Sequence, residues 1–379
     1  MNVLAISFER NAFIEGDPAR RRFARYGAVF EELHLIVYAK RSLGLSEVQI
    51  ADNVWLYPTN SLHKALYIAD AMRIARRLRR EGRVFDIVSG QDLAETGLAA
   101  WRIARLFDTP LHLQDHAGVF DAAFQRESMG NWLRTQFARF LLPKADGIRA
   151  VLDSGREQII SRYPALSAKV EVLPVYTDTD RLSTAAPEFS VRERYPQFSS
   201  IILMASRFVP QKNIPLALRA FREFLRVDSK AGLVLVGSGR EERRLRSMVS
   251  GLGMEGRVVF VPWEKDLISY YKGADLFLLS SRYESYGRTL VEAAACGLPF
   301  VASDVGVASM LVASGARGIV CTTRDPKEYA AAIAAHLNDP TPHLPGAGLG
   351  AVQALIGGSE EEYVARYKDM LAACMRQTV

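Results

Sequence analysis

The segment ADLFLLSSRYESYGRTLVEAAACGLPFVASD, from Ala274 to Asp304, decides the fold. It begins with an apolar run of strand length, passes through the polar turn SSRYESYG, and continues with a helical pattern over Arg288–Cys296. Gly297 then stands where helices commonly end, and a second apolar run, Leu298–Ala302, follows it. We therefore predict a strand–loop–helix–strand unit, from which parallel sheets are built.

Two glutamates, Glu284 in the loop and Glu292 about one turn into the helix, frame the predicted helix N-terminus. A helix N-terminus favours an anion, because its first N–H groups are free and its dipole is positive there. Carboxylates accept hydrogen bonds from hydroxyl groups. The simplest ligand with hydroxyls on both sides of a phosphate pair is a nucleotide sugar. The alternative is structural: Thr289 caps the helix and Glu292 closes a T-x-x-E capping box.

The length and composition are those of an ordinary globular protein. The chain has 379 residues, of which 49% are hydrophobic and 24% charged, so we expect two domains. The three cysteines, Cys296, Cys321 and Cys374, have no paired spacing, which argues against a disulfide framework or a zinc site. The first residues do not read as a signal peptide, and no apolar run approaches the ~20 residues that span a bilayer. We expect a cytoplasmic protein.

The net charge of +6 is concentrated in two basic clusters, Arg20–Arg25 and Arg73–Arg83. Either the clusters are solvated helix faces, or they make peripheral contact with an anionic membrane, where each Lys or Arg contributes ~1 kcal/mol. Nucleic acid is disfavoured as a partner, because zinc-finger spacing, a basic zipper and an aromatic RNP-like pattern are all missing from the sequence.

The first half alternates strand-like runs with amphipathic helical stretches, which predicts a doubly wound α/β sheet. In such sheets ligands bind beyond the carboxyl ends of the strands. The polar residues that follow strand ends are the candidates: Gly16 and Asp17 after the first strand, Asp92 after Phe85–Ser89, and His116 after Leu111–Gln114. His116 is either a turn residue or a group that hydrogen-bonds a sugar hydroxyl or stabilises charge on a leaving group.

The second half repeats the alternation. A strand over Ile201–Ala205 leads into a loop that carries Arg207 and Lys212, two cations suited to a diphosphate, or else simple surface charges. The next strand ends in Gly237-Ser238-Gly239, where glycines let the backbone approach a phosphate. Glu242 stands where a dinucleotide fingerprint has its third glycine, so a dehydrogenase is poorly supported.

The domain boundaries are expected near residues 180 and 358. Residues 1–180 form the first domain, residues 181–358 form the second, and residues 359–379 form a helix that packs back on the first. Ser359 and Glu362 make a capping box at the start of that helix. Asp178 and Asp180 form a D-x-D motif, which we interpret as a turn or hinge rather than a metal site.

The segments ASRFVPQKNIPLALRAF, LVLVGSGRE and ADLFLLSSRYESYGRTLVEAAACGLPFVASDVG resemble the donor domain of the family four glycosyltransferases, a large retaining family. They occur in the family's order and spacing over roughly residues 200–320. The first half resembles the family more loosely, around DIVSGQDLAETGLAAWRIARLFDTPLHLQDHAG. The resemblance implies the GT-B fold: two Rossmann-like domains that face each other across a cleft.

The resemblance also implies roles for single residues. Arg207 and Lys212 bind the donor diphosphate, Glu292 holds the ribose hydroxyls, and Glu284 lies near the transferred sugar. His116 approaches the donor sugar from the other domain. Backbone N–H groups from Gly237 to Gly239 and of Tyr286, Gly287, Arg288 and Thr289 line the site. Ser285 and Tyr286 replace the family's commoner Gly-Phe pair, so we expect a hydroxyl contact from them. On the acceptor side, where Gly16 stands alone instead of in the family's paired-glycine loop, the candidates are Gly16, Asp17 and Asp92.

The implied activity is transfer of a sugar from a UDP- or GDP-linked donor to a hydroxyl of a saccharide or lipid-linked saccharide, with retention of configuration. We expect no cofactor and no metal, and a role in polysaccharide or glycolipid synthesis. One alternative is a nucleotide-sugar epimerase, which needs no acceptor. The other is a non-catalytic protein that binds nucleotide sugars or the membrane surface.

Overall fold

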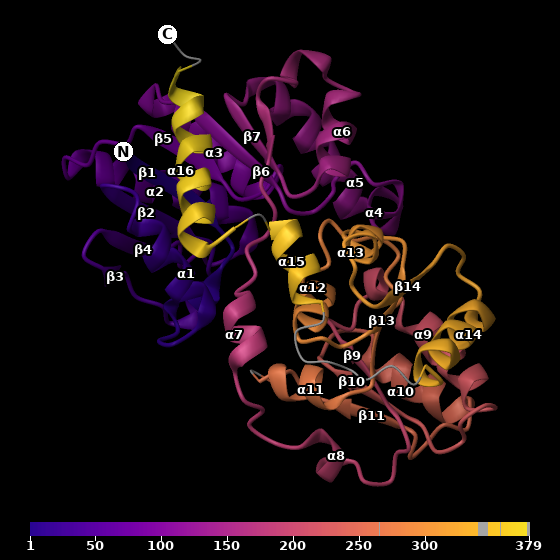
Figure 1. The fold of residues 1–379 in the computed structure, drawn as a ribbon. Helices are drawn as coiled ribbons and strands as arrows, with labels where there is room; N and C mark the ends of the chain where they lie inside the picture. The colour runs from indigo at the N-terminus through magenta and orange to yellow at the C-terminus, as the bar shows by residue number, and fades with distance from the viewer. Residues whose placement is uncertain (265, 340–347, 357, 377–379) are drawn as a thin grey trace. The chain divides into compact units, whose positions relative to one another are not determined.

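The computed structural model describes residues 1–264, 266–339, 348–356 and 358–376. It divides the chain into two compact units, one of Met1–Pro174 with Ser359–Val379 and one of Val175–Gly358. Each unit is built on its own sheet (Figure 1).

The first unit contains an eight-stranded sheet in the order β3-β4-β2-β1-β5-β6-β7-β8. Its strands are β1 (Asn2–Ser7), β2 (Glu32–Val37), β3 (Val48–Ala51), β4 (Val54–Pro58), β5 (Ile87–Gly90), β6 (Leu111–Asp115), β7 (Gly147–Ala150) and β8 (Val170–Val172). All neighbours pair in parallel except β3, which pairs antiparallel with β4 at the edge. The central strands β1 and β2 are mainly apolar and buried, because helices cover both faces of a parallel sheet. β6 is equally buried but carries the polar residues His112, Gln114 and Asp115.

Helices connect these strands and complete the first unit. They are α1 (Pro18–Gly27), α2 (Tyr67–Arg80), α3 (Glu95–Phe107), α4 (Ala122–Glu127), α5 (Met129–Leu141), α6 (Asp153–Ile160) and α16 (Glu360–Arg376), with 3₁₀ turns η1 (Arg10–Phe13), η2 (Arg41–Leu43), η3 (Lys64–Leu66), η4 (Leu142–Lys144) and η5 (Pro164–Leu166). The C-terminal helix α16 packs against β6 and β7 of this sheet (Figure 1). Its predicted capping box is confirmed: Ser359 N donates to Glu362 Oε2 at 2.8 Å, and Glu362 N donates to Ser359 Oγ at 3.2 Å.

Some element bounds differ from those expected from the sequence. Strand β3 was not predicted, because it is a short edge strand without a clear alternating pattern. The strand expected over Phe85–Ser89 is observed as Ile87–Gly90, and just before it the Asp86 carboxylate accepts a hydrogen bond from Asn2 N at 2.7 Å. The first residues of the predicted second domain contain the end of α7 (Thr179–Thr184) and the short helix α8 (Val191–Arg194).

The second unit contains a six-stranded sheet in the order β11-β10-β9-β12-β13-β14, with all neighbours parallel. Its strands are β9 (Ile201–Ala205), β10 (Gly232–Val236), β11 (Val258–Val261), β12 (Leu276–Leu279), β13 (Phe300–Ser303) and β14 (Gly318–Cys321). In chain order this is the 3-2-1-4-5-6 arrangement of a dinucleotide-binding sheet, whose direction reverses between β9 and β12. The deciding segment is confirmed as β12, α12 (Arg288–Ala295) and β13.

The remaining helices of the second unit flank this sheet. They are η6 (Pro210–Lys212), α9 (Ile214–Phe224), α10 (Glu242–Gly251), α11 (Ile268–Gly273), α13 (Ala308–Ala313), α14 (Pro326–Leu337) and α15 (Leu349–Ile356). The core lies between the sheet and helices α9 and α14, which contact each other (Figure 1). Phe221 and Tyr329 are among its fully buried side chains. This core fixes the two loops that leave β9 and β12.

Candidate functional site

The loops after β9 and β12 meet where the strand order of the second sheet reverses. Ser280 Oγ donates to the carbonyls of Lys212 and Asn213 at 3.0 and 3.1 Å, and Arg282 N donates to Gln211 O at 2.8 Å. Ligands of doubly wound sheets bind at such a reversal, outside the carboxyl ends of the strands. The hydrogen bonds therefore hold two binding loops side by side at the expected place.

Lys212 and Glu284 form an ion pair in this site, with Lys212 Nζ 2.5 Å from Glu284 Oε1. Only 13% of the lysine side chain and 8% of the glutamate side chain are exposed. Ser281 Oγ also donates to Glu284 Oε1, at 2.7 Å. The structure thus brings together the predicted diphosphate-binding lysine and the predicted sugar-side carboxylate, 72 residues apart in sequence.

Gln211 joins Arg207 to the same carboxylate. Arg207 Nη2 donates to Gln211 Oε1 at 3.5 Å, and Gln211 Nε2 donates to Tyr283 O at 3.2 Å and to Glu284 Oε2 at 3.5 Å. Gln211 was not predicted as a site residue. It lies inside a quoted motif, but the sequence gives no local signal for a bond to a loop 72 residues further on.

Glu292 lies on the first turns of α12, and its carboxylate is held by two donors. Tyr271 OH donates to its Oε2 at 3.0 Å, and Arg288 Nε donates to its Oε1 at 2.8 Å. Burial, followed by the negative charge of Glu292, raises the pKa of Tyr271 well above its ordinary value, so its hydroxyl stays protonated and donates. Glu292 is therefore an oriented acceptor close to the N-terminus of the helix.

The alternative in which Thr289 caps α12 is wrong. The N-cap residue is Gly287, which has a left-handed conformation with φ of 94° and makes no side-chain cap. Such a φ favours glycine, because a β-carbon would be strained there. Thr289 is already the second residue of the helix, and Glu292 has other partners, so the T-x-x-E pattern does not act as a capping box here.

The remaining donor-side residues belong to the loop after β12 and to the first turn of α12. Ser285 precedes Gly287 in the loop, and Arg288 and Thr289 begin α12, where the first N–H groups have no acceptor within the helix. Tyr286 is buried, and its carbonyl accepts a hydrogen bond from Val307 N at 2.9 Å. Of this group, Tyr286 thus has an observed packing role besides any contact with a ligand.

Gly237 and Gly239 let the loop after β10 pack against the loop after β9. A β-carbon on Gly237 would lie 1.9 Å from Ser206 O, and one on Gly239 would lie 2.4 Å from Phe208 O. Phe208 N donates to Ser238 O at 2.8 Å between the same loops. The two glycines therefore position the loop that carries Arg207.

The acceptor-side candidates lie in the first unit, near the reversal of its sheet between β1 and β5. Gly16 has a left-handed φ of 75°, and Asp17 caps α1 by accepting from Ala19 N at 2.8 Å. Asp92 accepts from Ala94 N at 2.6 Å and from Thr96 N at 3.1 Å at the start of α3. Burial raises the pKa of Asp92, and the backbone N–H groups oppose that shift. Asp17 thus has a structural role as a cap, Asp92 accepts from backbone N–H groups at the start of α3, and acceptor contact remains a prediction.

His116 follows β6 in the first unit, and its Nε2 lies 2.9 Å from Gln114 Oε1. The residue as a whole is exposed to solvent. The pKa of its ring is nevertheless lowered, by the crowding of protein atoms around it and then by the positive charges of Arg149 and Arg22. The direction of this shift favours the neutral ring, in which one nitrogen donates and one accepts.

Asp178, the first residue of the D-x-D motif, is the N-cap of α7 and accepts from Arg181 N at 3.0 Å. Within the described part of the chain, no group of three or more His, Cys, Asp or Glu side chains is arranged to hold a metal ion. The turn interpretation of the motif agrees with this capping role.

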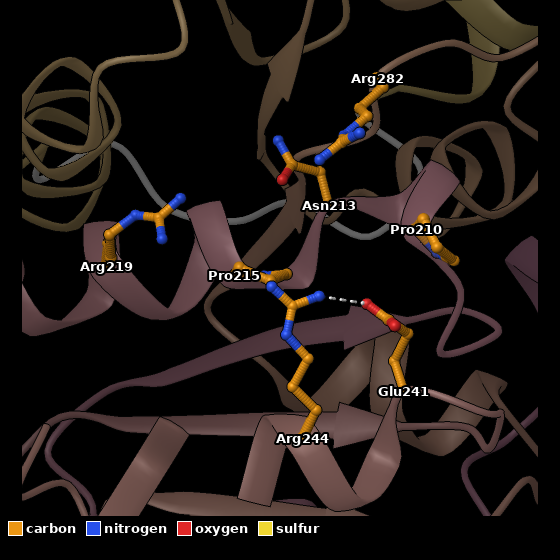
Figure 2. Close-up of a pocket in the computed structure, with 7 residues that line it drawn as sticks. All are labelled: Pro210, Asn213, Pro215, Arg219, Glu241, Arg244 and Arg282. Carbon is orange, nitrogen blue, oxygen red and sulfur yellow. Dashed lines mark hydrogen bonds and ion pairs between the residues drawn. The ribbon is translucent and has the colours of Figure 1, made fainter. Parts of the chain in front are cut away.

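A small pocket with a volume of about 110 Å³ opens beside η6 and the start of α9 (Figure 2). It is lined by Pro210, Asn213, Pro215, Arg219, Glu241, Arg244 and Arg282. Figure 2 shows Arg244 paired with Glu241, at 3.2 Å. The side chains of Lys212, Glu284 and Glu292 do not line it, so we place the candidate site in the hydrogen-bonded loops instead.

Two family models match the chain. The model described as glycosyl transferases group 1 matches residues 187–345, and the model described as glycosyltransferase family 4 matches residues 31–181. The first match contains every predicted donor-side residue of the second unit, and the second contains His116 and Asp92.

Curated relatives match part of the chain. A D-inositol 3-phosphate glycosyltransferase of Acidothermus cellulolyticus is 32% identical over 191 residues, which is 46% of this chain and 42% of the relative. A GDP-mannose-dependent alpha-(1-6)-phosphatidylinositol monomannoside mannosyltransferase of Mycolicibacterium smegmatis is 33% identical over 186 residues, 46% of this chain and 49% of the relative. The chain thus spans about half the length of these relatives.

Solved structures resemble the fold over its full length. Sucrose-phosphate synthase from Thermosynechococcus elongatus has a TM-score of 0.80 at 20% identity. The match covers 98% of this chain and 100% of the synthase chain. The Anabaena protein HepE, in complex with UDP-glucose, has a TM-score of 0.71 at 17% identity, with 100% and 98% of the two chains covered. These likenesses confirm the predicted fold class of two Rossmann-like α/β domains.

Proposed function

Because the chain belongs to the group 1 and family 4 glycosyltransferases, we propose that it transfers a sugar from a nucleoside diphosphate sugar to an acceptor hydroxyl, with retention of configuration. The observation that carries this proposal is the cluster of Arg207, Lys212 and Glu284 at the strand reversal of the second sheet. Such a cluster offers cations to a diphosphate and a carboxylate to sugar hydroxyls, which are the two chemistries of one donor.

The donor is a UDP- or GDP-linked sugar. The HepE structure contains UDP-glucose, and the name of the mycobacterial relative specifies GDP-mannose. The acceptor is a hydroxyl of a saccharide or of a lipid-linked saccharide. The names of the two relatives specify inositol phosphate and a phosphatidylinositol mannoside, which are hydroxyl acceptors that carry phosphate. The product belongs to polysaccharide or glycolipid synthesis.

The residues act by stabilising the leaving diphosphate. Negative charge grows on its oxygens as the sugar departs, and Arg207, Lys212 and the N-terminus of α12 supply positive potential there. Removing one such donor typically lowers the rate by ~10²–10³. The leaving phosphate takes the acceptor proton on the same face of the sugar, so no protein nucleophile is needed. Glu292 orients the ribose, and His116 acts at the donor sugar.

A cytoplasmic location with peripheral contact to an anionic membrane is part of this proposal, and the basic clusters are one candidate surface for that contact. Five of their arginines are paired in the structure: Arg22 with Glu9, Arg25 with Glu360, Arg73 with Asp70, Arg77 with Glu47, and Arg83 with Glu32. Arg76 and Arg80 face solvent on α2. Among the described residues, no helix combines the length and hydropathy that crossing a bilayer requires.

The test is calorimetric titration of the full chain with UDP, GDP, ADP and dTDP, followed by sugar transfer assays with the matching donors. We expect one nucleotide to bind tightly, and binding to weaken in Lys212→Ala by ~1.5–3 kcal/mol, the value of one charged hydrogen bond. Binding of none of the four by folded protein would overturn the donor site. A product formed without any acceptor would indicate an epimerase, and binding without turnover across many acceptors would indicate a binding protein.

A further inference from the structure

Helix α5 carries its large apolar side chains on the outside. The residues that it buries are small or polar: Asn131, Thr135 and Ala138, with Leu141 at its end. Asn131 Nδ2 donates to Phe124 O at 3.1 Å, and Thr135 Oγ1 donates to Val119 O at 2.9 Å. The exposed fractions of its apolar residues are 72% for Met129, 47% for Trp132, 46% for Leu133, 38% for Phe137 and 44% for Phe140. This is the reverse of an ordinary surface helix.

The exposed face extends onto the neighbouring helix α3 and has a cationic border. Trp101 and Phe140 make an edge-to-face contact with centroids 5.1 Å apart. Lys144 Nζ lies 4.1 Å from the centroid of Phe140, and the Arg105 guanidinium carbon lies 5.4 Å from that of Trp101. Arg102 and Arg139 are exposed on the same two helices. Of the acidic residues nearby, Glu95 is paired with Arg134 at 2.8 Å, and Asp108 is exposed at the end of α3.

We infer that this face, made of Met129, Trp132, Leu133, Phe137 and Phe140 with Arg102, Arg105, Arg139 and Lys144, docks on an anionic lipid bilayer. Exposed contiguous apolar surface of this kind marks an interaction site. A helix that lies in a bilayer interface combines Trp, Phe and Leu on one side with Lys and Arg beside them, and its cations attract anionic headgroups. The combination of exposed aromatic side chains with positively charged residues therefore fits an anionic lipid surface. This inference stands on α5 and its surroundings and does not depend on the sugar transfer.

Flotation with vesicles of phosphatidylcholine, with and without phosphatidylglycerol, tests the surface. We expect the full chain to float with the anionic vesicles. Trp132→Ser with Phe137→Ser should reduce the apparent partition coefficient about tenfold or more, because two exposed apolar side chains that would enter the bilayer are lost. Leu62→Ser is the matched control, since Leu62 is 74% exposed elsewhere in the same unit. Arg76→Glu with Arg80→Glu tests the alternative surface on α2.

Three outcomes would overturn the inference. The first is that the wild type does not float with anionic vesicles. The second is that Arg76→Glu with Arg80→Glu abolishes flotation while Trp132→Ser with Phe137→Ser leaves it unchanged. The third is that the wild type sediments as a dimer without lipid and that the α5 variant dissociates this dimer. The last would identify the face as an interface between copies of the chain. Nucleotide binding measured on the same samples keeps a failed donor site distinct from a failed membrane surface.

A buried arginine of the first unit, Arg149, is connected to His116 through the side chain of Gln114. Its Nη1 donates to Gln114 Oε1 at 3.1 Å, its Nη2 donates to Pro174 O at 2.6 Å and Tyr363 OH at 2.5 Å, and its Nε donates to Leu173 O at 2.9 Å. The acceptors in these bonds are carbonyls, an amide and a hydroxyl, rather than a carboxylate. A guanidinium only donates, so the oxygen of the Gln114 amide has to face it.

The orientation of the Gln114 amide determines which nitrogen of His116 carries the proton. The nitrogen of the Gln114 amide points the other way and donates to Ser89 Oγ at 3.3 Å and Tyr367 OH at 3.1 Å. Gln114 Oε1 also lies 2.9 Å from His116 Nε2. Since this oxygen only accepts, Nε2 has to carry the proton, and Nδ1 of the neutral ring is then an acceptor.

We also infer that Arg149 and Gln114 are positioning residues that fix His116 in the Nε2–H tautomer. The accepting nitrogen of the neutral ring is then Nδ1. The tautomer itself is a property of the protein without substrate, so its measurement is independent of whether sugar transfer occurs.

Proton–nitrogen correlation spectra of the full chain with labelled histidine test this relay. The chain has six histidines, and the signals of His116 are those lost in His116→Gln. We expect a single Nε2–H tautomer in the wild type, and a mixed tautomer in Gln114→Met and Arg149→Met. Arg139→Met is the control, because Arg139 contacts Gln136 Oε1 on the exposed side of α5. An Nδ1–H ring in the wild type, or an unchanged ring in folded Gln114→Met, would overturn the inference. Gln114→Met and the wild-type spectrum decide it if Arg149→Met does not fold.

Discussion

Lys212 and Glu284 meet as a largely buried ion pair at the strand reversal of the second sheet, with Nζ and Oε1 2.5 Å apart. The pair holds the loop after β9 to the loop after β12. It also keeps the cation ready for a phosphate, because a donor diphosphate offers a second anionic partner for the same ammonium. One contact therefore serves both the stability of the loops and the proposed binding of the donor.

Breaking one half of this pair should destabilise the second unit, and breaking both should partly restore it. Lys212→Met or Glu284→Gln alone is expected to cost about 3 kcal/mol, since each leaves a buried partner without its counter-charge. The double variant Lys212→Met with Glu284→Gln should be more stable than the two single effects predict, and yet it should bind no nucleotide. Urea unfolding of the four proteins, with calorimetric titration of each, measures both quantities. Additive losses of stability would contradict the coupling.

Glu292→Gln should weaken nucleotide binding and leave the fold intact. The amide oxygen of the variant still accepts from Tyr271 OH, but the charged acceptor for ribose hydroxyls is lost. We expect the affinity for a nucleoside diphosphate to fall at least about tenfold, as for one charged hydrogen bond. Glu242→Gln is the matched control, because Glu242 pairs with Arg246 at the same i,i+4 spacing on α10. Equal losses in both variants would refute the assigned role.

Gly237→Ala and Gly239→Ala should destabilise the second unit by about 1–3 kcal/mol, because the added methyl group has to displace backbone of the Ser206–Phe208 loop. Nucleotide affinity should fall as well, since that loop carries Arg207. Gly251→Ala is the control: a β-carbon there meets no atom within 4 Å, and alanine favours the helix. The midpoint of urea unfolding measures the effect. Wild-type midpoints for Gly237→Ala and Gly239→Ala would show that the two loops are not packed as closely as we describe.

His112 should make the first unit sensitive to mild acid. Burial, followed by the charge of Arg149, lowers its pKa to about 3, while an unfolded histidine titrates near its ordinary value of 6.5. Between these values the unfolded chain binds the additional proton. The contribution of His112 to stability is therefore full above pH 6.5 and is lost progressively as the pH falls toward 3, at about 1.4 kcal/mol per pH unit at most.

His112→Gln should remove this component of the acid sensitivity. Glutamine can keep the contact that His112 Nδ1 makes with Ser89 Oγ at 3.0 Å and has no charge to gain. Urea midpoints at pH 7 and pH 5 should differ less in the variant than in the wild type. The exposed residue His63 provides the control substitution, His63→Gln, which should leave the difference unchanged. An undiminished difference in His112→Gln would exclude His112 as its source.

The local pattern of the chain was sufficient for much of the fold. The run Ala274–Asp304 predicted β12, α12 and β13 in the right order, because apolar strands, a polar turn and a glycine stop are properties of neighbouring residues. The capping box of Ser359 and Glu362 was predicted for the same reason. The edge strand β3 was missed, since four residues of mixed character carry little signal.

The candidate site was predictable only in its parts. The sequence placed Arg207, Lys212, Glu284 and Glu292 after strand ends, where ligands of an α/β sheet bind. It did not show that Gln211 bridges Arg207 to Glu284, nor that Glu292 is held by Tyr271, because these contacts join segments far apart in the chain. It also suggested that Thr289 caps α12, whereas the N-cap residue in the structure is Gly287, in a left-handed conformation.

The sequence by itself determined the family, the strand–helix alternation and the residue types of the site, because these depend on motifs and on short-range periodicity. Only the tertiary structure decided which of these residues touch. Long-range packing pairs Lys212 with Glu284, turns the apolar side of α5 outward, and sets Arg149 behind Gln114 and His116. Hydrogen bonds and ion pairs act over about 3 Å, so they depend on positions that the sheet and its core fix after the chain has folded.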